Sequence, residues 1–205
     1  MATYKEIKCV TIQTRDEDTT ENVGTWASAP NLNAACREGG GSGTSTSAIN
    51  VGGYPYPMTS EQWNGSTWAT FANMGTPRGK NASAGTYTNA IVGNGSTPGT
   101  PSIGIVNNVE TWNGSSWSEI AENNSDKTGG MAFGSNANSG FAFVSSTTEF
   151  WNGTSWTEVN DQSTGKTEGG SGGVSDSGLA FGGPSNETAT EEWTAGLANK
   201  TITAS

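Results

Sequence analysis

A tryptophan hairpin motif constrains this chain more than any other feature of its sequence. It reads Trp63-Asn64-Gly65-Ser66-Thr67-Trp68 and returns from Trp112 to Trp117 and from Trp151 to Trp156. Asn-Gly between residues of strand character predicts a β-hairpin with a two-residue type I′ loop. Such a loop would place Trp63 opposite Ser66 and Glu61 opposite Trp68, with the two indoles diagonal to each other on one packed face.

The motif belongs to a unit of 39–49 residues that recurs from Gly24 onward. The first tryptophans of the hairpins are Trp63, Trp112, Trp151 and Trp193, and the second ones are Trp26, Trp68, Trp117 and Trp156. A basic residue follows each second tryptophan after 10 or 11 positions: Arg37, Arg78, Lys127 and Lys166. A glutamate stands two places before each first tryptophan: Glu61, Glu110, Glu149 and Glu191.

Two further segments complete each unit and predict the fold. A Gly-rich segment ends at Gly43, Gly85, Gly134 and Gly173, and an apolar run follows it at 47–53, 89–92, 140–144 and 178–183. Four strands per unit of this length indicate an all-β fold, a small β-propeller. We assign inner strand a to the Gly-rich segment, b to the apolar run, and c and d to the hairpin arms. Small inner residues let the blades converge, and large ones fill the space between blades.

The ends of the repeat predict the number of blades. The last unit stops after Trp193 without a second hairpin arm, and the repeat begins at Trp26 with an arm that has no partner. We therefore expect four four-stranded blades, with the N-terminal strand around Trp26 completing the last blade beside Trp193 and removing its free edge. An open array that a neighbouring chain closes is the alternative.

Three regions follow from this assignment: an N-terminal extension at 1–23, the propeller at 24–193 and a C-terminal extension at 194–205. Residues 5–14 are expected to form a strand, and residues 15–18 a polar turn. Both extensions are candidates for docking onto another protein.

Composition narrows the classes of function. The apolar share is only 31%, but eight tryptophans at regular spacing indicate a repeated core rather than disorder. The net charge of −10 disfavours nucleic acid as a partner, because phosphate binding needs clustered basic residues. No apolar run predicts membrane insertion, and residues 1–13 do not read as a signal peptide.

The residue types in this sequence give little support for a catalytic site or a metal site. Histidine is absent, which removes the commonest general base and metal ligand, so we expect no cofactor, no metal and no enzyme activity. The two cysteines, Cys9 and Cys36, are expected to be buried thiols, although one bridge between them is the alternative. The repeated basic and glutamate positions favour structural ion pairs within or between blades over a ring that binds an anion.

Two insertions between strands b and c break the symmetry of the repeat. The first blade carries Tyr54-Pro55-Tyr56-Pro57-Met58, and the second carries 93–108 with Pro98 and Pro101. Both should emerge on one face, and loops on a rigid scaffold often carry function. Tyr54, Tyr56, Met58, Pro98 and Pro101 are therefore the candidate binding residues, for a glycan or a protein, against the alternative of a merely packed loop.

The unit resembles the kelch repeat at 24–193. Shared features are the basic residue, the apolar strand ending in Gly-Gly at Gly52-Gly53 and Gly182-Gly183, the tryptophan, and a loop ending near Pro77-Arg78. The second and third units lack the Gly-Gly pair.

The whole chain also resembles Gly/Ser/Thr-rich kelch-like proteins of marine bacteriophages that infect cyanobacteria. The similar parts are residues 1–8, Asn22-Val23-Gly24-Thr25-Trp26 and units of the form Glu-x-Trp-Asn-Gly-x-Ser-Trp. This resemblance implies a virion structural protein, made in the host cytoplasm, whose partners are other virion proteins and a host-surface glycan or receptor. A tail, fibre or baseplate-associated adhesin-like module is expected. A capsid or tail decoration protein that docks through its termini is the alternative, and a glycan hydrolase is a weaker one.

Overall fold

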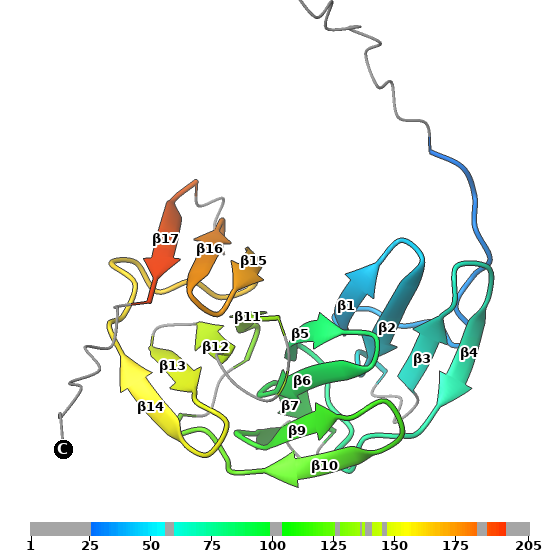
Figure 1. The fold of residues 1–205 in the computed structure, drawn as a ribbon, viewed down its shortest axis with the longest axis horizontal. Helices are drawn as coiled ribbons and strands as arrows, with labels where there is room; N and C mark the ends of the chain where they lie inside the picture. The colour runs from blue at the N-terminus through cyan, green and yellow to red at the C-terminus, as the bar shows by residue number, and fades with distance from the viewer. Residues whose placement is uncertain are drawn as a thin grey trace, which may run out of the picture.

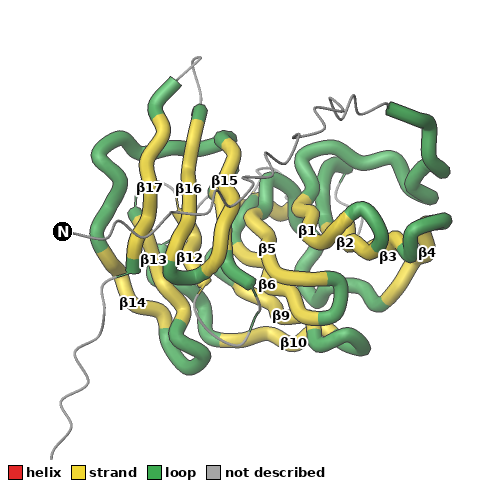
Figure 2. The backbone as a smooth tube through the Cα atoms, turned by 45° about the horizontal axis from the view of Figure 1, so that its top comes forward, coloured by secondary structure: helices red, strands yellow, loops and turns green. Residues whose placement is uncertain are grey.

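The computed structural model describes residues 26–55, 60–98, 104–125, 128–135, 137, 141–144, 147–183 and 188–195. These residues form strands and loops and contain no helix (Figure 2). The fold is therefore all-β and propeller-like, as the repeat predicts. Outside the described part lie the expected strand at 5–14, residues 196–205 of the predicted extension 194–205, and Cys9, Tyr56, Met58, Pro101 and Lys127.

Four antiparallel sheets follow one another along the chain (Figure 1). Sheet 1 contains β1 (Gly40–Thr44), β2 (Ser47–Val51), β3 (Ser60–Trp63) and β4 (Trp68–Phe71). Sheet 2 contains β5 (Ala82–Thr86), β6 (Asn89–Gly93), β9 (Val109–Trp112) and β10 (Trp117–Ile120). Sheet 3 contains β11 (Met131–Phe133), β12 (Phe141–Val144), β13 (Thr148–Trp151) and β14 (Trp156–Val159). Sheet 4 contains β15 (Gly170–Val174), β16 (Ser177–Phe181) and β17 (Thr190–Thr194), and a small sheet pairs β7 (Ser96–Thr97) with β8 (Gly104–Ile105).

The hairpin loop has four residues rather than the predicted two. Trp63 pairs directly with Trp68, so the expected pairs Trp63–Ser66 and Glu61–Trp68 are wrong. The Asn64 side-chain oxygen accepts hydrogen bonds from the amides of Ser66 and Thr67, both at 2.9 Å, and this local turn sets the loop length. The register differs from the predicted one by two residues, so each side chain stays on its predicted face.

Three apolar clusters hold the sheets together, and each lies between two neighbours. Ile49 and Val51 of sheet 1 pack with Val92 and Trp112 of sheet 2. The next cluster joins sheets 2 and 3: Ala82, Ile91, Val109, Ala132, Ala137, Trp151 and Trp156. The last cluster joins sheets 3 and 4: Met131, Phe133 and Ala180, with Phe150 and Trp193 against them. Large side chains therefore fill the space between sheets, as expected for blades.

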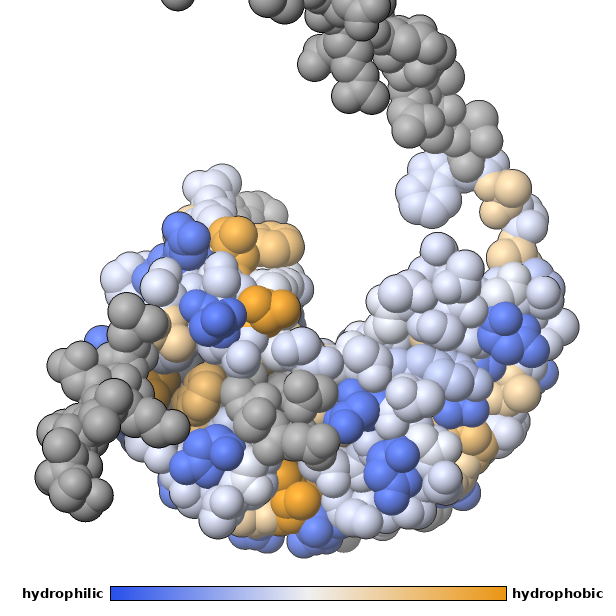
Figure 3. Space-filling model, viewed as in Figure 1, coloured by the Kyte–Doolittle hydropathy of each residue, from blue (hydrophilic) through white to orange (hydrophobic). Residues whose placement is uncertain are grey.

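The four sheets form an open arc. Inner strands β1, β5, β11 and β15 are neighbours in that order, and an opening separates sheet 4 from sheet 1 (Figures 1 and 3). The expected closure is wrong for the described residues. Trp26 is fully exposed and lies in no strand, and β17 is the edge of a three-stranded sheet. Three packed junctions set the curvature of the arc, and sheet 4 does not reach sheet 1.

Candidate functional site

Each sheet uses its repeated glutamate to hold the loop that leads into the same sheet. Glu61 on β3 accepts hydrogen bonds from the amides of Asn33 and Ala34. The same arrangement recurs at the other sheets: Glu110 with Gly75 and Thr76, Glu149 with Asn124, and Glu191 with Ser163 and Thr164. We call these four arrangements the glutamate clasps. They fix the loops that lead into the sheets, so the glutamate column has a structural role.

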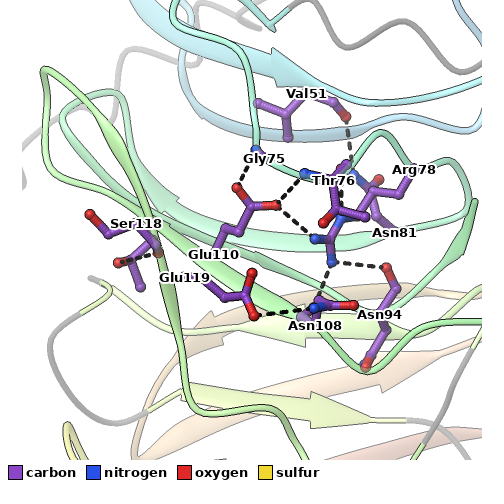
Figure 4. Close-up of polar contacts among 11 residues, drawn as sticks. Val51, Gly75, Thr76, Arg78, Asn81, Asn94, Asn108, Glu110, Ser118 and Glu119 are labelled. Carbon is purple, nitrogen blue, oxygen red and sulfur yellow. Dashed lines mark hydrogen bonds and ion pairs between the residues drawn. The ribbon is translucent and has the colours of Figure 1, made fainter.

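Arg78 completes the clasp of sheet 2 (Figure 4). Its guanidinium is fully buried and lies 2.8 Å from the Glu110 carboxylate. The same guanidinium donates to the backbone oxygens of Asn108, Thr76 and Asn94 at 2.5, 3.3 and 3.5 Å. Burial lowers the pKa of Arg78, while the Glu110 charge opposes that shift. The hydrogen-bonding groups of Arg78 are therefore used within the fold and are not directed toward a ligand.

Lys166 has the same role in sheet 4. Its ammonium is buried and lies 2.9 Å from Glu191. The hydrogen bond from Lys166, followed by those from Ser163 and Thr164, lowers the pKa of Glu191 from 4.5 to about 2. For these two units, the predicted ion pairing between the basic and glutamate positions is confirmed.

Arg37 does not belong to the buried basic column, so its predicted place there is wrong. The bridge between Arg37 and Tyr54 corresponds to the bridge between Gly79 and Ser96, which aligns Cys36 with Arg78. Cys36 is a half-buried free thiol, and its Sγ accepts a hydrogen bond from Asn50. The spacing of 11 residues after Trp26, against 10 elsewhere, was the sequence signal for this shift.

The displaced Arg37 forms an exposed pair with Tyr54. Its guanidinium carbon lies 4.2 Å from the centre of the Tyr54 ring, and the two residues exchange backbone hydrogen bonds of 3.2 and 2.7 Å. Tyr54 is 41% exposed. The result is an aromatic ring and a cation presented together at the start of the first insertion.

The second insertion lies beside the first. Ser96 exchanges backbone hydrogen bonds with Gly79, and Gly53 donates to the Arg78 carbonyl at 2.8 Å. The insertion contains the β7–β8 pair, with Ile105 and Pro98 exposed. Both insertions therefore emerge on one face, as predicted, and we call the surface around Arg37, Tyr54 and Pro98 the insertion face.

A cavity of about 390 Å³ opens at the centre of the arc beside the insertion face. Four equivalent residues with positive φ surround it: Glu38, Lys80, Gly129 and Glu168. Lys80 donates its amide to Glu38, Gly129 to Lys80, and Glu168 to Gly129, all between backbone atoms. The Lys80 ammonium also lies 2.9 Å from the Glu168 carboxylate. Sequence reasoning missed this cluster, although each member stands at the same offset in its unit.

The predicted binding residues remain predictions. Of the five, the structure places Tyr54 and Pro98, both exposed and both on the insertion face. Of the eight predicted blade tryptophans, seven lie in sheets 1 to 4, and Trp26 does not.

Two features are absent from the described residues. These residues contain no group of three or more His, Cys, Asp or Glu side chains placed to hold a metal ion. None of their segments is a helix with the length and apolarity needed to span a bilayer.

Comparison with known proteins identifies a similar fold. No family model matches the chain, and no curated protein matches it. The solved structure of YjhT is similar, with a TM-score of 0.66 and 11% identity, over 84% of this chain and 68% of that chain. The match supports an all-β, propeller-like fold, and about a third of YjhT has no counterpart here.

Proposed function

We propose that this protein is a non-enzymatic structural component of a bacteriophage virion, in the tail, fibre or baseplate, and that its insertion face contacts a protein or glycan at the host surface. In this proposal the four sheets are the blades of a kelch-like propeller. The sequence resemblance to phage kelch-like proteins supports the virion, and the arrangement of the charged residues supports a binding role.

One observation carries the binding role. Arg78 and Lys166 are buried and held by the clasp glutamates, whereas Arg37 lies outside that column, over the exposed ring of Tyr54. Its contact with a glutamate is a longer one, 3.9 Å to the exposed Glu38. Sugar rings stack on aromatic side chains, and both Arg and Tyr are enriched where proteins bind each other. The pair breaks the symmetry of the repeat, as a binding site on a repeated scaffold usually does.

Adsorption of phage to host cells tests this proposal. Tyr54→Ala and Arg37→Ala should each reduce the adsorption rate constant several-fold, whereas Tyr54→Phe keeps the ring and should retain most of it. Thr88→Ala is the control, because Thr88 is exposed in the β5–β6 turn at the opposite end of its sheet. Unchanged adsorption of a phage that carries both alanine substitutions would contradict the proposal.

Two alternatives are separated by further measurements. A decoration protein that docks through its termini should lose incorporation into particles when residues 1–14 are deleted, while the purified protein still unfolds cooperatively. An adhesin-like module whose contact is the insertion face should keep its binding to host cells after that deletion. Release of reducing sugar from host polysaccharide would instead favour the glycan hydrolase.

A further inference from the structure

Sheet 4 lacks the tryptophan partner that the other sheets have. Trp63 and Trp68 lie with ring centres 5.6 Å apart, Trp112 and Trp117 at 5.4 Å, and Trp151 and Trp156 at 5.2 Å. Trp193 occupies the first position of such a pair, but β17 is the last strand of its sheet among the described residues. Among the described residues, neither a second tryptophan nor a fourth strand belongs to sheet 4.

A cavity of about 210 Å³ lies where the missing indole belongs. Its walls include Phe133, Thr148, Asn160 and Trp193. In sheets 2 and 3 the second indole donates to a carbonyl four residues after the previous second tryptophan. Trp117 donates to Ala72 at 3.0 Å and Trp156 to Ala121 at 2.7 Å. By this rule, the carbonyl for the missing indole is that of Asn160.

Trp26 has the right spacing to fill this cavity. It stands seven residues before the clasp residue Asn33, as Trp68 does before Gly75 and Trp156 before Ser163. It is nevertheless fully exposed, and residues 26–32 belong to no strand. In the described part of the chain, Trp26 is thus a second-position tryptophan that lies in no sheet, and sheet 4 has a second-position cavity without a tryptophan.

The apolar face of sheet 4 is uncovered as well. Leu179 and Phe181 are 43% and 46% exposed, whereas Ile49 and Val51 at the same strand positions of sheet 1 are buried against sheet 2. Hydrophobic side chains gather beside the opening in Figure 3. The position that would cover them belongs to a following sheet.

The chain's own Trp26 is held away from this site. Asn33 and Ala34 are bound to Glu61, which anchors the Trp26 segment to sheet 1 across the opening (Figure 1). Closing the opening within one chain would require the three junctions to bend, and their clusters are buried and close-packed. A second copy can reach the site without any change in the arc.

We propose that β17 and its cavity receive the Trp26 strand of a second copy of this chain, and that sheet 1 of that copy covers Leu179 and Phe181. Trp26 then lies opposite Trp193, and Ala27 opposite Glu192, in the register of Trp156 with Trp151. The contact joins two different surfaces, so it produces a reciprocal dimer or a larger ring. The proposal does not depend on the proposed function.

Light scattering after size exclusion gives the first test. The wild-type protein should have at least twice the 21.0 kDa mass of one chain, and Trp26→Ala should have the mass of one chain. The substitution leaves the isolated fold intact because Trp26 contacts no sheet. Ile105→Ala, another exposed apolar residue, is the matched control and should behave as the wild type. A wild-type mass of one chain at every concentration would overturn the proposal.

Disulfide trapping between two singly substituted proteins identifies the contact. Ala27→Cys and Glu192→Cys, both at exposed positions, are mixed, oxidised and digested, and the linked peptides are read by mass spectrometry. A peptide joining positions 27 and 192 can then only come from two chains, and we expect it as the main product. A single chain that carries both Ala27→Cys and Glu192→Cys is oxidised in parallel. If the link forms in this chain but not between the two singly substituted proteins, the Trp26 strand pairs with β17 of its own chain and the proposal is overturned.

Discussion

At the scale of single residues, charge burial decides which side chains are structural. Arg78 and Glu110 are both almost fully buried, and each satisfies the other together with nearby backbone groups. Lys80 and Glu168 make an equally short contact but remain exposed to solvent. Water screens the Lys80–Glu168 pair much more than the Arg78–Glu110 pair, so the two pairs differ in their contribution to stability.

Glu110→Ala should therefore destabilise the protein by about 3–5 kcal/mol, because it leaves the Arg78 charge buried without its partner. Glu168→Ala should cost about 1 kcal/mol or less. Urea unfolding measures both. The double change Arg78→Met with Glu110→Leu should recover only part of the loss, since it removes both charges but leaves the amides of Gly75 and Thr76 without their acceptor. Equal effects of Glu110→Ala and Glu168→Ala would contradict the assignment.

The clasp of sheet 4 should make stability depend on pH. The folded pKa of Glu191 is about 2, below its ordinary value of 4.5, so its contribution is fully present above 4.5 and is lost as pH falls toward 2. The difference in unfolding free energy between wild type and Glu191→Gln should be constant above pH 4.5 and shrink below it. A difference that stays constant down to pH 2 would show that Glu191 is not held as the structure has it.

At the scale of elements, the hairpin loops are local structures that fix the register of each sheet. The asparagine side chain turns the chain, and the following glycine has φ near +90°, for example +94° at Gly114. An L-residue in this conformation places its Cβ too close to the following carbonyl. The loop therefore depends on both residues of the Asn-Gly pair.

Gly114→Ala should destabilise the protein by about 1–2 kcal/mol through this backbone strain. Ser115→Ala, the next position of the same loop, should have little effect, because that side chain is exposed. Thermal unfolding compares the two variants. A fully tolerated alanine at position 114 would mean that the loop adopts another turn.

At the scale of the whole molecule, equivalent positions of the repeat differ in burial, because a sheet at an end of the arc has a neighbouring sheet on one side only. Ile91 and Leu179 occupy the same place in sheets 2 and 4, yet Ile91 is buried against sheet 3 and Leu179 faces the opening. In a propeller-like repeat, the neighbouring sheet supplies the burial for each sheet face. A side chain on a sheet face should therefore contribute to the free energy of unfolding only where a neighbouring sheet covers it.

In the Trp26→Ala background, where the chain is expected to be alone, Ile91→Ala should cost about 2–5 kcal/mol. Leu179→Ala should change stability by about 0.5 kcal/mol or less. Chemical denaturation gives both values. A large loss for Leu179→Ala in this background would show that the opening is covered by the chain itself.

The sequence by itself determined the strands of sheets 1 to 3 and the three strands of sheet 4, with their order and the faces of their side chains, but not the β7–β8 pair. These depend on the period-two pattern, on the spacing of the tryptophans and on turn chemistry, all of which are local. It also indicated the ion pairs and the shared face of the insertions. The four-residue loop was missed because the Asn64 side chain, rather than Asn-Gly φ angles alone, sets the turn.

Only the tertiary structure decided whether the arc closes and which residues stay exposed. Closure depends on the angles between neighbouring sheets at the three packed junctions. The spacing of the repeated residues along the sequence does not encode these angles. In the structure Trp26 lies outside the sheets. The same is true of Arg37, which an extra residue moves out of the buried column and onto Tyr54. Long-range packing fixes both, because burial is a property of neighbours in space rather than of neighbours in the chain.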